Sequence, residues 1–303
     1  MTISTSLYYD RSASRINAIS TQTQTLQERI SSGKKIANAS DDVVAYQRLQ
    51  GIAVASANDT ATGKNIALAQ TLLAQTDSAL GSVTTQIQRA QELAIQANSG
   101  TVSDADKKII ADQLRGLVDE LVTLANSTDV RGGPLFGAAT GNSAVTVGAG
   151  GVVSFTGTGT PNAIPIGDAG KIQPTESAER VFGGIAQGGG TTDVFAIINT
   201  LADALDAGGS SVAAAGSAID GLKLALDQVN GVRGSAGARS ARLDLEATKL
   251  EDTGIDREAD RSNLEDTDIT ATIANLQKAS TVLQATQASF ARLSQLSLFD
   301  YLR

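Results

Sequence analysis

The sequence predicts a mainly α fold: long antiparallel coiled-coil helical arms come from both chain ends, with a small Gly/Pro-rich, β-containing insert in the middle. Three observations predict it. All four prolines and 16 of the 30 glycines lie between 131 and 190. Proline and glycine disfavour helix interiors, so the helices are expected on either side of this stretch. Along both flanks, apolar residues recur at alternating spacings of three and four, which is typical of coiled coils.

The first flank contains three such repeats, and the longest one lies within a helix that the start signal at Ser40 and the stop signal at 98–100 predict over 41–98. A shorter repeat consists of Ile110, Leu114, Leu117, Leu121 and Leu124. Because seven-residue periodicity is sustained for more than three heptads, the long repeat indicates packing against a partner helix along its whole length. Its members are Ile66, Ala69, Leu73, Thr76, Leu80, Val83, Ile87, Ala90, Ala94 and Ala97.

Capping residues predict where these helices begin. Ser40 precedes Asp41 and Asp42, so we expect Ser40 to be the N-cap, with two carboxylates in the first turn where the helix dipole favours them. Ser103 followed by Asp106 is a variant of the capping box and predicts the start of the next helix.

The second flank carries one long repeat and a final helix with little charge. The stretch 244–268 has ten acidic and three basic residues, which we interpret as a solvated face. The helix expected over 270–299 has so few charges that burial against copies of itself or a partner is favoured. The long repeat consists of Val212, Ala215, Ile219, Leu222, Leu226, Val229, Arg233, Ala236, Ser240, Leu243, Ala247 and Leu250.

The middle segment contains short β-like pieces at 144–147, 152–155 and 163–166, separated by glycine and proline turns. We interpret Gly188 to Gly190 as a linker back into helix. The chain is therefore expected to have three parts: terminal assembly arms at 1–40 plus 265–303, a helical rod at 41–130 plus 191–264, and a small outward-facing β-rich insert at 131–190.

Composition excludes several classes of function. The chain has no Cys and no His, which excludes thiol nucleophiles, Ser–His–Asp triads and His-bearing metal sites. Its net charge of −8 disfavours nucleic acid as the main partner. We find no apolar run long enough for membrane insertion and no cleavable hydrophobic signal. We therefore expect no enzyme activity, no cofactor and no resident metal.

Both chain ends carry apolar residues, although termini are usually polar and frayed. We expect the apolar stripes of the two arms to form an assembly interface, in which roughly 1.5–3 kcal/mol is gained for each fully buried Leu or Phe. The residues assigned to it are Ile3, Leu7, Ile16, Ile19, Leu26, Ile30, Leu276, Leu283, Phe290, Leu293, Leu296, Phe299 and Leu302.

Six segments resemble the bacterial flagellin family, and within it the branch of hook-associated junction proteins. They are 3–6, 26–35, with its Ser-Ser-Gly-Lys turn, 40–42, 88–100, 264–268 and 288–302. The last segment, ending in Leu-Ser-Leu-Phe-Asp-Tyr-Leu, resembles the junction proteins most specifically.

The resemblance implies a structural subunit of the bacterial flagellum that joins hook to filament. It implies secretion by the flagellar type III apparatus, terminal arms that are disordered in the monomer, and an inner coiled-coil tube formed on assembly. The implied partners are another hook-associated protein, flagellin, copies of the chain itself and an export chaperone that binds the C-terminal arm.

Two other functions stay open at this point. A filament flagellin proper would share both arms. A surface carbohydrate-binding protein could use residues 131–190, although only Phe136, Phe155 and Phe182 could serve there as aromatic platforms.

Overall fold

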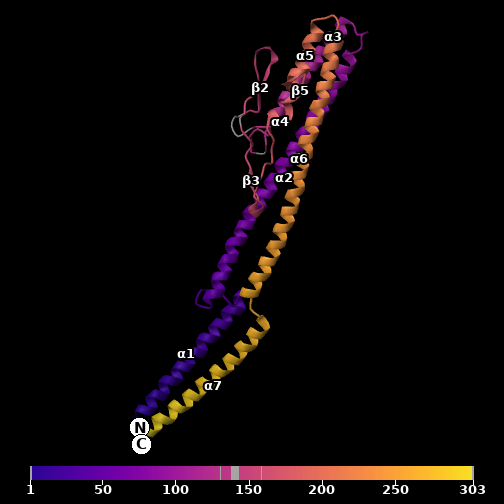
Figure 1. Ribbon diagram of the computed structural model, residues 1–303. Helices are drawn as coiled ribbons and strands as arrows, with labels where there is room; N and C mark the ends of the chain where they lie inside the picture. Colours follow the sequence, from indigo (N-terminus) through magenta and orange to yellow (C-terminus); the bar gives the residue numbers. More distant parts are fainter. Residues whose placement is uncertain (1, 130, 138–142, 158, 302–303) are drawn as a thin grey trace. The chain divides into compact units, whose positions relative to one another are not determined.

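The computed structural model describes residues 2–129, 131–137, 143–157 and 159–301. It divides into two compact units, which we call the terminal unit (Met1–Ala57 with Asp252–Arg303) and the central unit (Asn58–Glu251). Helices α2 (Val43–Ala97) and α6 (Val212–Glu265) contribute residues to both units (Figure 1). The predicted fold class is confirmed: helices dominate, and the short strands fall within the predicted middle segment or at its edge.

Helix α2 follows the predicted repeat closely. All ten members of the repeat between Ile66 and Ala97 are buried. In the central unit, α2 packs against α6, and polar links flank the apolar seam. Arg233 Nε donates to Asp77 Oδ1 at 2.9 Å, and the Gln70 side chain donates to Asp244 at 2.7 Å. The low-charge, aliphatic repeat therefore does form the inner face of a long helix pair.

The expected N-cap of α2 was wrong. Asp42 is the cap, because its Oδ1 accepts the backbone N–H of Ala45 at 2.9 Å and the helix begins directly after it. Asp41 instead accepts two backbone N–H groups of the preceding turn, and the bond from Asn38 contributes most to holding the pKa of Asp41 below its ordinary value. The Asp41 carboxylate therefore closes the turn and the Asp42 carboxylate caps the helix, so Ser40 is not at the cap position.

Helices α3 (Asp104–Ala125) and α5 (Val194–Asp206) pack on each other in the central unit. The predicted cap of α3 is confirmed: Ser103 Oγ accepts the Asp106 N–H at 3.2 Å and donates to the Asp106 carboxylate at 2.7 Å. Asp193 caps α5 through the Ala196 N–H at 2.8 Å, and burial raises the pKa of Asp193.

The predicted repeat of α6 was half right. Ala215, Leu222, Val229, Ala236 and Leu243 are buried as expected. Between them, the buried residue lies one position earlier in the chain than the repeat predicted. The small side chains on this face lie deeper than the large ones that the repeat favoured. The buried set includes Ala218, Ala225 and Val232, whereas Ile219, Leu226 and Arg233 are only half-buried.

The main core of the central unit joins the four helices α2, α3, α5 and α6 with part of the middle segment. Three fully buried aromatic rings lie in it. The ring of Phe182 lies 6.0 Å from that of Phe136 and 5.2 Å from that of Phe195. A smaller cluster further along the helix pair includes Ile66, Leu243 and, from the middle segment, Ile166 and Ile172.

Where the structure describes it, the middle segment forms three antiparallel two-stranded hairpins, one short α-helix and two single-turn 3-10 helices. The pairs are β1 (Val145–Val147) with β2 (Val153–Phe155), β3 (Ile164–Pro165) with β4 (Lys171–Ile172), and β5 (Ile185–Gln187) with β6 (Gly190–Thr192). Helix α4 (Ala178–Phe182) precedes the last hairpin. The first three strands confirm the predicted β pieces, while β4, β5, β6 and α4 were missed.

The interpretation of Gly188 to Gly190 as a linker into helix was wrong. Gln187 pairs with Gly190, so Gly188 and Gly189 form the two-residue turn of the β5–β6 hairpin. Their φ angles are 62° and 81°, which glycine adopts without strain and which the type I′ hairpin turn requires at both positions.

An ion-pair cluster links the middle segment to α6. The Glu176 side chain is only 4 % exposed and lies between Arg180 and Arg239. Arg239 also donates to the Gln173 carbonyl at 2.6 Å, and Gln228 donates to the Gly183 carbonyl at 2.7 Å. The segment is thus held by buried charge as well as by apolar contact.

Candidate assembly interface

Helices α1 (Thr2–Ser32) and α7 (Ile269–Tyr301) run antiparallel, side by side, in the terminal unit (Figure 1). Among the side chains of the pair that the structure describes, Leu26 and Ala279, each 8 % exposed, are the best buried apolar ones. The Tyr9 ring meets the Phe290 ring edge-on at 5.5 Å. The two helices therefore form a thin seam rather than a filled core.

The structure brings together the central members of the predicted interface. Their side chains are buried or half-buried, whereas that of Leu7 is exposed. The side chains of Ile3, Leu293, Leu296 and Phe299, and the whole of Leu302, lie outside the described residues. The members placed at partly or fully buried positions are Ile16, Ile19, Leu26, Ile30, Leu276, Leu283 and Phe290.

Apolar side chains outside the predicted set are also exposed in this unit. Ile269, Ile273 and Val282 on α7 are 40–49 % exposed, and Val43 and Val44 at the start of α2 are 58 % and 62 % exposed. Sequence reasoning missed most of these residues because they do not continue a long repeat. Ile269 is the exception: it lies seven residues before Leu276 and continues the stripe of α7. Two packed helices can bury only one face each, so these apolar side chains stay exposed in the single chain.

The junctions where α1 and α6 end are bonded to each other. Gly33, with a φ of 72°, turns the chain out of α1. The Lys35 N–H donates to the Glu265 carbonyl at 2.7 Å, and the Thr267 N–H donates to the Gly33 carbonyl at 2.9 Å. This short antiparallel bridge links the segments that follow α1 and α6.

Charged side chains strengthen this bridge. Lys34 pairs with Glu265, and Arg261 pairs with Glu265 at 3.0 Å and with Glu258. The hydrogen bonding that Arg261 donates to Glu258 is the main reason why the pKa of Arg261 is raised, and it also lowers the pKa of Glu258. Several of the acidic residues in 244–268 are therefore engaged in local pairs at the helix junction.

The last acidic residues of that stretch lie where α6 ends and α7 begins. Asp268 Oδ1 accepts the Ala271 N–H at 3.0 Å, and Asp266 accepts the Ser262 hydroxyl. Over the described residues, no group of three or more Asp and Glu side chains is arranged to hold a metal ion. Nor does any helix in the described ranges combine the length and apolarity needed to cross a membrane.

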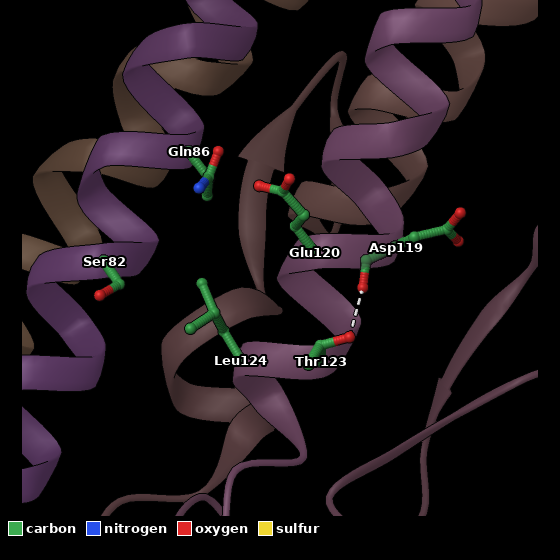
Figure 2. A pocket seen from close by; sticks show the side chains of 6 residues that line it. All are labelled: Ser82, Gln86, Asp119, Glu120, Thr123 and Leu124. Atoms are coloured by element: carbon green, nitrogen blue, oxygen red, sulfur yellow. Dashed lines mark hydrogen bonds between the residues drawn. The ribbon is translucent and has the colours of Figure 1, made fainter.

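The central unit has a groove of about 430 Å³ between α2 and α3. Figure 2 shows Gln86, Glu120 and Leu124 in the gap, while Asp119 points away from it. The Thr123 hydroxyl is bonded to the Asp119 carbonyl at 2.9 Å, within the same helix. The groove combines one apolar side chain with one carboxylate and has no arrangement typical of catalysis.

Comparison with known proteins agrees with this architecture. A family model of the bacterial flagellin N-terminal helical region matches residues 3–140, and one of the C-terminal helical region matches residues 219–302. The flagellar hook-associated protein 3 of Salmonella typhimurium is 30 % identical over 331 residues, covering 99 % of each chain. A flagellin of Listeria innocua is 29 % identical over 269 residues, covering 89 % of this chain and 86 % of its own.

A solved structure has the same fold. The putative flagellar hook-associated protein from Vibrio parahaemolyticus has a TM-score of 0.68 at 18 % identity, covering 75 % of this chain and 100 % of its own. Matches to both helical regions and a relative at 30 % identity over 99 % of each chain lead to one conclusion: the chain belongs to the bacterial flagellin family.

Proposed function

We propose that this chain is a secreted structural subunit of the bacterial flagellum that joins hook to filament, as a hook-associated junction protein. One observation carries the proposal. Similarity to hook-associated protein 3 covers 99 % of both chains, whereas the Listeria flagellin match covers 89 % of this chain and 86 % of that protein. The junction protein is therefore favoured over a filament flagellin proper.

The mechanism is packing rather than chemistry. The thin α1–α7 seam and the exposed apolar side chains beside it gain burial only when further helices cover them. We propose that residues 1–40 and 265–303 act as assembly arms, with the thirteen predicted interface residues as their contacts. The proposed partners are another hook-associated protein on one side, flagellin on the other and neighbouring copies of the chain. An export chaperone would bind the C-terminal arm before assembly.

The carbohydrate-binding alternative is not favoured. It needs exposed aromatic rings in the middle segment, but Phe136 and Phe182 are fully buried in the core of the central unit. Phe155 is half-buried, with its ring 6.4 Å from that of Phe195. The candidate platforms serve the core of the protein instead.

The position of the protein along the flagellum tests the proposal. Immunogold labelling should give one spot near the base of each filament. In a strain lacking the gene, filaments should be lost and flagellin should appear in the medium, and the intact gene should restore both. Labelling along the entire filament would identify a filament flagellin and overturn the proposal.

A chain truncated after Arg292 tests the role of the C-terminal arm. It should melt like the intact protein, because the central unit ends at Glu251. It should nevertheless fail to restore filaments. Full-length filaments supported by the truncated chain would contradict the assembly role, and so would a melting temperature far below that of the intact chain.

A further inference from the structure

The segments that follow α1 and α6 form a short antiparallel bridge within the terminal unit. Lys34 and Asp266 lie opposite each other in it, and the two backbone hydrogen bonds described above lie on either side of this pair. We call residues 33–35 and 265–267 the connector bridge. Because α1 ends at Ser32 and α7 begins at Ile269, each of these helices is attached to the connector bridge by one end.

The Glu265 side chain holds the connector bridge together from inside. It is only 12 % exposed and pairs with Lys34 across the bridge and with Arg261 on its own helix. Lys35 adds a further bond across the bridge, from its Nζ to the Asn263 carbonyl at 2.7 Å. A nearly buried carboxylate is specific in its position, because the loss of a cation would leave its charge uncompensated. The connector bridge is therefore held by side chains as well as by backbone bonds.

The seam between α1 and α7 continues the register of the connector bridge. Tyr9 lies 25 residues before Lys34, and its ring partner Phe290 lies 24 residues after Asp266. The two rings therefore meet at nearly equal distances along the chain from the bridge. A slip of one helical turn would offset them by about four residues. The two helices thus pair in the register that the bridge defines.

The seam itself specifies its register only weakly. Thr, Ser and Ala make up much of both helices, so a slip of one turn often replaces one small side chain by another. In coiled coils, a polar or charged contact at one position fixes the register more strictly than uniform apolar packing does. In the terminal unit, the nearly buried ion pair between Lys34 and Glu265 is a contact of this kind.

We propose that the connector bridge sets the register in which α1 and α7 pair, and that pairing extends from the bridge toward the chain ends. Once the bridge is closed, the nearest ends of both helices are held side by side, so each further turn of pairing closes only a short loop. Lys34 and Glu265 are the positioning residues. This assignment rests on the proposed function and deepens it, because helices paired in one register present one fixed interface to neighbouring subunits.

Crosslinking of the purified full-length chain measures the register, because the chain contains no Cys. Tyr9→Cys with Phe290→Cys reports the observed register. Tyr9→Cys with Thr286→Cys reports a slip of one turn, since Thr286 lies one turn before Phe290 on the same face of α7. A short bismaleimide is added at low protein concentration, and intramolecular products are quantified by mass spectrometry. We expect the first pair to react about ten times more than the second, because hydrogen bonds to charged groups favour one register by about that factor.

Reversal of charge in the connector bridge should remove this preference. Glu265→Lys places a third cation beside Lys34 and Arg261, so the two reporter pairs should react within about two-fold of each other. The addition of Lys34→Glu restores an opposite-charge pair across the bridge and should return most of the preference. Glu258→Lys is the matched control: Glu258 also pairs with Arg261, but its side chain is 63 % exposed and lies outside the bridge. The control should keep the full preference.

Three results would overturn the proposal. Equal yields from the two reporter pairs in the chain with an unaltered bridge, or no product from either pair, would show that the bridge imposes no register. A preference that survives Glu265→Lys would show that the seam sets its own register. Loss of the preference in Glu258→Lys, or no recovery when Lys34→Glu is added, would show that the charge change acts in some way other than through the bridge.

The crosslinking result and the proposed function can fail separately, because the measurement uses the purified chain. Immunogold labelling along the entire filament would refute the junction function whatever the crosslinks show. Label at the filament base together with equal yields from the two reporter pairs would refute only the role of the connector bridge.

Discussion

The central and terminal units share the helices α2 and α6 but bury their side chains to different extents. In the central unit, a third layer from α3, α5 and the middle segment covers the helix pair, and Leu80, Val83 and Ile87 are fully buried. In the described part of the terminal unit, the best buried apolar side chains are Leu26, Ile36 and Ala279, at 7–8 % exposure. The first unit is completed within one chain, while we propose that the second gains its remaining burial from neighbouring subunits.

The two units should differ most in the rates at which their backbone amides exchange hydrogen in the monomer. Amides of α2 between 80 and 94 should exchange only through global unfolding, which costs about 5–15 kcal/mol for a typical domain. Amides of α1 and α7 should exchange orders of magnitude faster, because ordering costs about 1–2 kcal/mol per residue and little apolar area is buried in return.

Limited trypsin digestion provides an independent measurement. It should trim residues 1–40 and 265–303 and leave a stable fragment of about 41–264. Equal protection of both units in the monomeric protein would remove the distinction between them.

Removal of an aromatic ring should give the second-largest difference between the units, measured as a loss in the free energy of unfolding. Phe195→Ala removes a fully buried ring that packs 5.2 Å from Phe182, and should lower the free energy of unfolding by about 3–5 kcal/mol. Phe290→Ala removes a half-buried ring that touches Tyr9, and should lower the free energy of unfolding by less than about 1 kcal/mol. Denaturant titration followed by circular dichroism measures both. Similar losses for the two variants would contradict the comparison.

The same difference in packing explains how much of the fold the sequence could predict. The repeat of α2 was predicted in full because its apolar residues keep one spacing along one face. On α6 the predicted repeat favoured Ile219 and Leu226, whereas the structure buries Ala218 and Ala225. Periodicity favours large residues, but close helix packing places small ones deepest.

The middle segment and the interface were harder to predict. The turn at Gly188 is set by strand pairing, which three consecutive glycines do not reveal. In the candidate interface, the apolar stripes on α1 and α7 were visible in the sequence. The groove between the start of α2 and the end of α6, which Gly51 and Ile52 line, was not visible, because it arises only when segments about 200 residues apart lie side by side.

Removal of a buried ion pair of the middle segment should lower stability by less than the loss of a core aromatic ring and by more than the loss of a helix cap. Arg239→Met leaves the nearly buried Glu176 with one partner and removes the bond to the Gln173 carbonyl, which should cost about 2 kcal/mol. Arg180→Met is the control: Arg180 also pairs with Glu176, but its side chain is 57 % exposed and its loss should cost at most about 1 kcal/mol. Thermal melting of both variants measures the difference, and the reverse order of costs would show that the Arg239 contacts do not fasten the segment.

Helix caps should give the smallest difference between the units, and they can be compared directly because the same kind of bond occurs in both. Ser103→Ala removes the cap of α3 and should cost about 1 kcal/mol, visible as a lower melting temperature of the whole central unit. Asp42→Ala removes the cap of α2 in the terminal unit. It should leave that melting temperature unchanged and instead speed exchange of the Ala45 amide by about five-fold. Ser40→Ala, next to it but outside the cap, should change neither quantity.

The outcome depends on whether the start of α2 unfolds separately from the rest of that helix. If Asp42→Ala lowers the melting temperature as much as Ser103→Ala does, the two units unfold together in the monomer and the terminal unit does not depend on neighbours for its stability. If only the local exchange rate responds, the free energy of the cap is confined to a segment that opens independently. Repeating the exchange measurement on assembled junctions should then abolish the five-fold difference, because the start of α2 would be held by the contacts between copies.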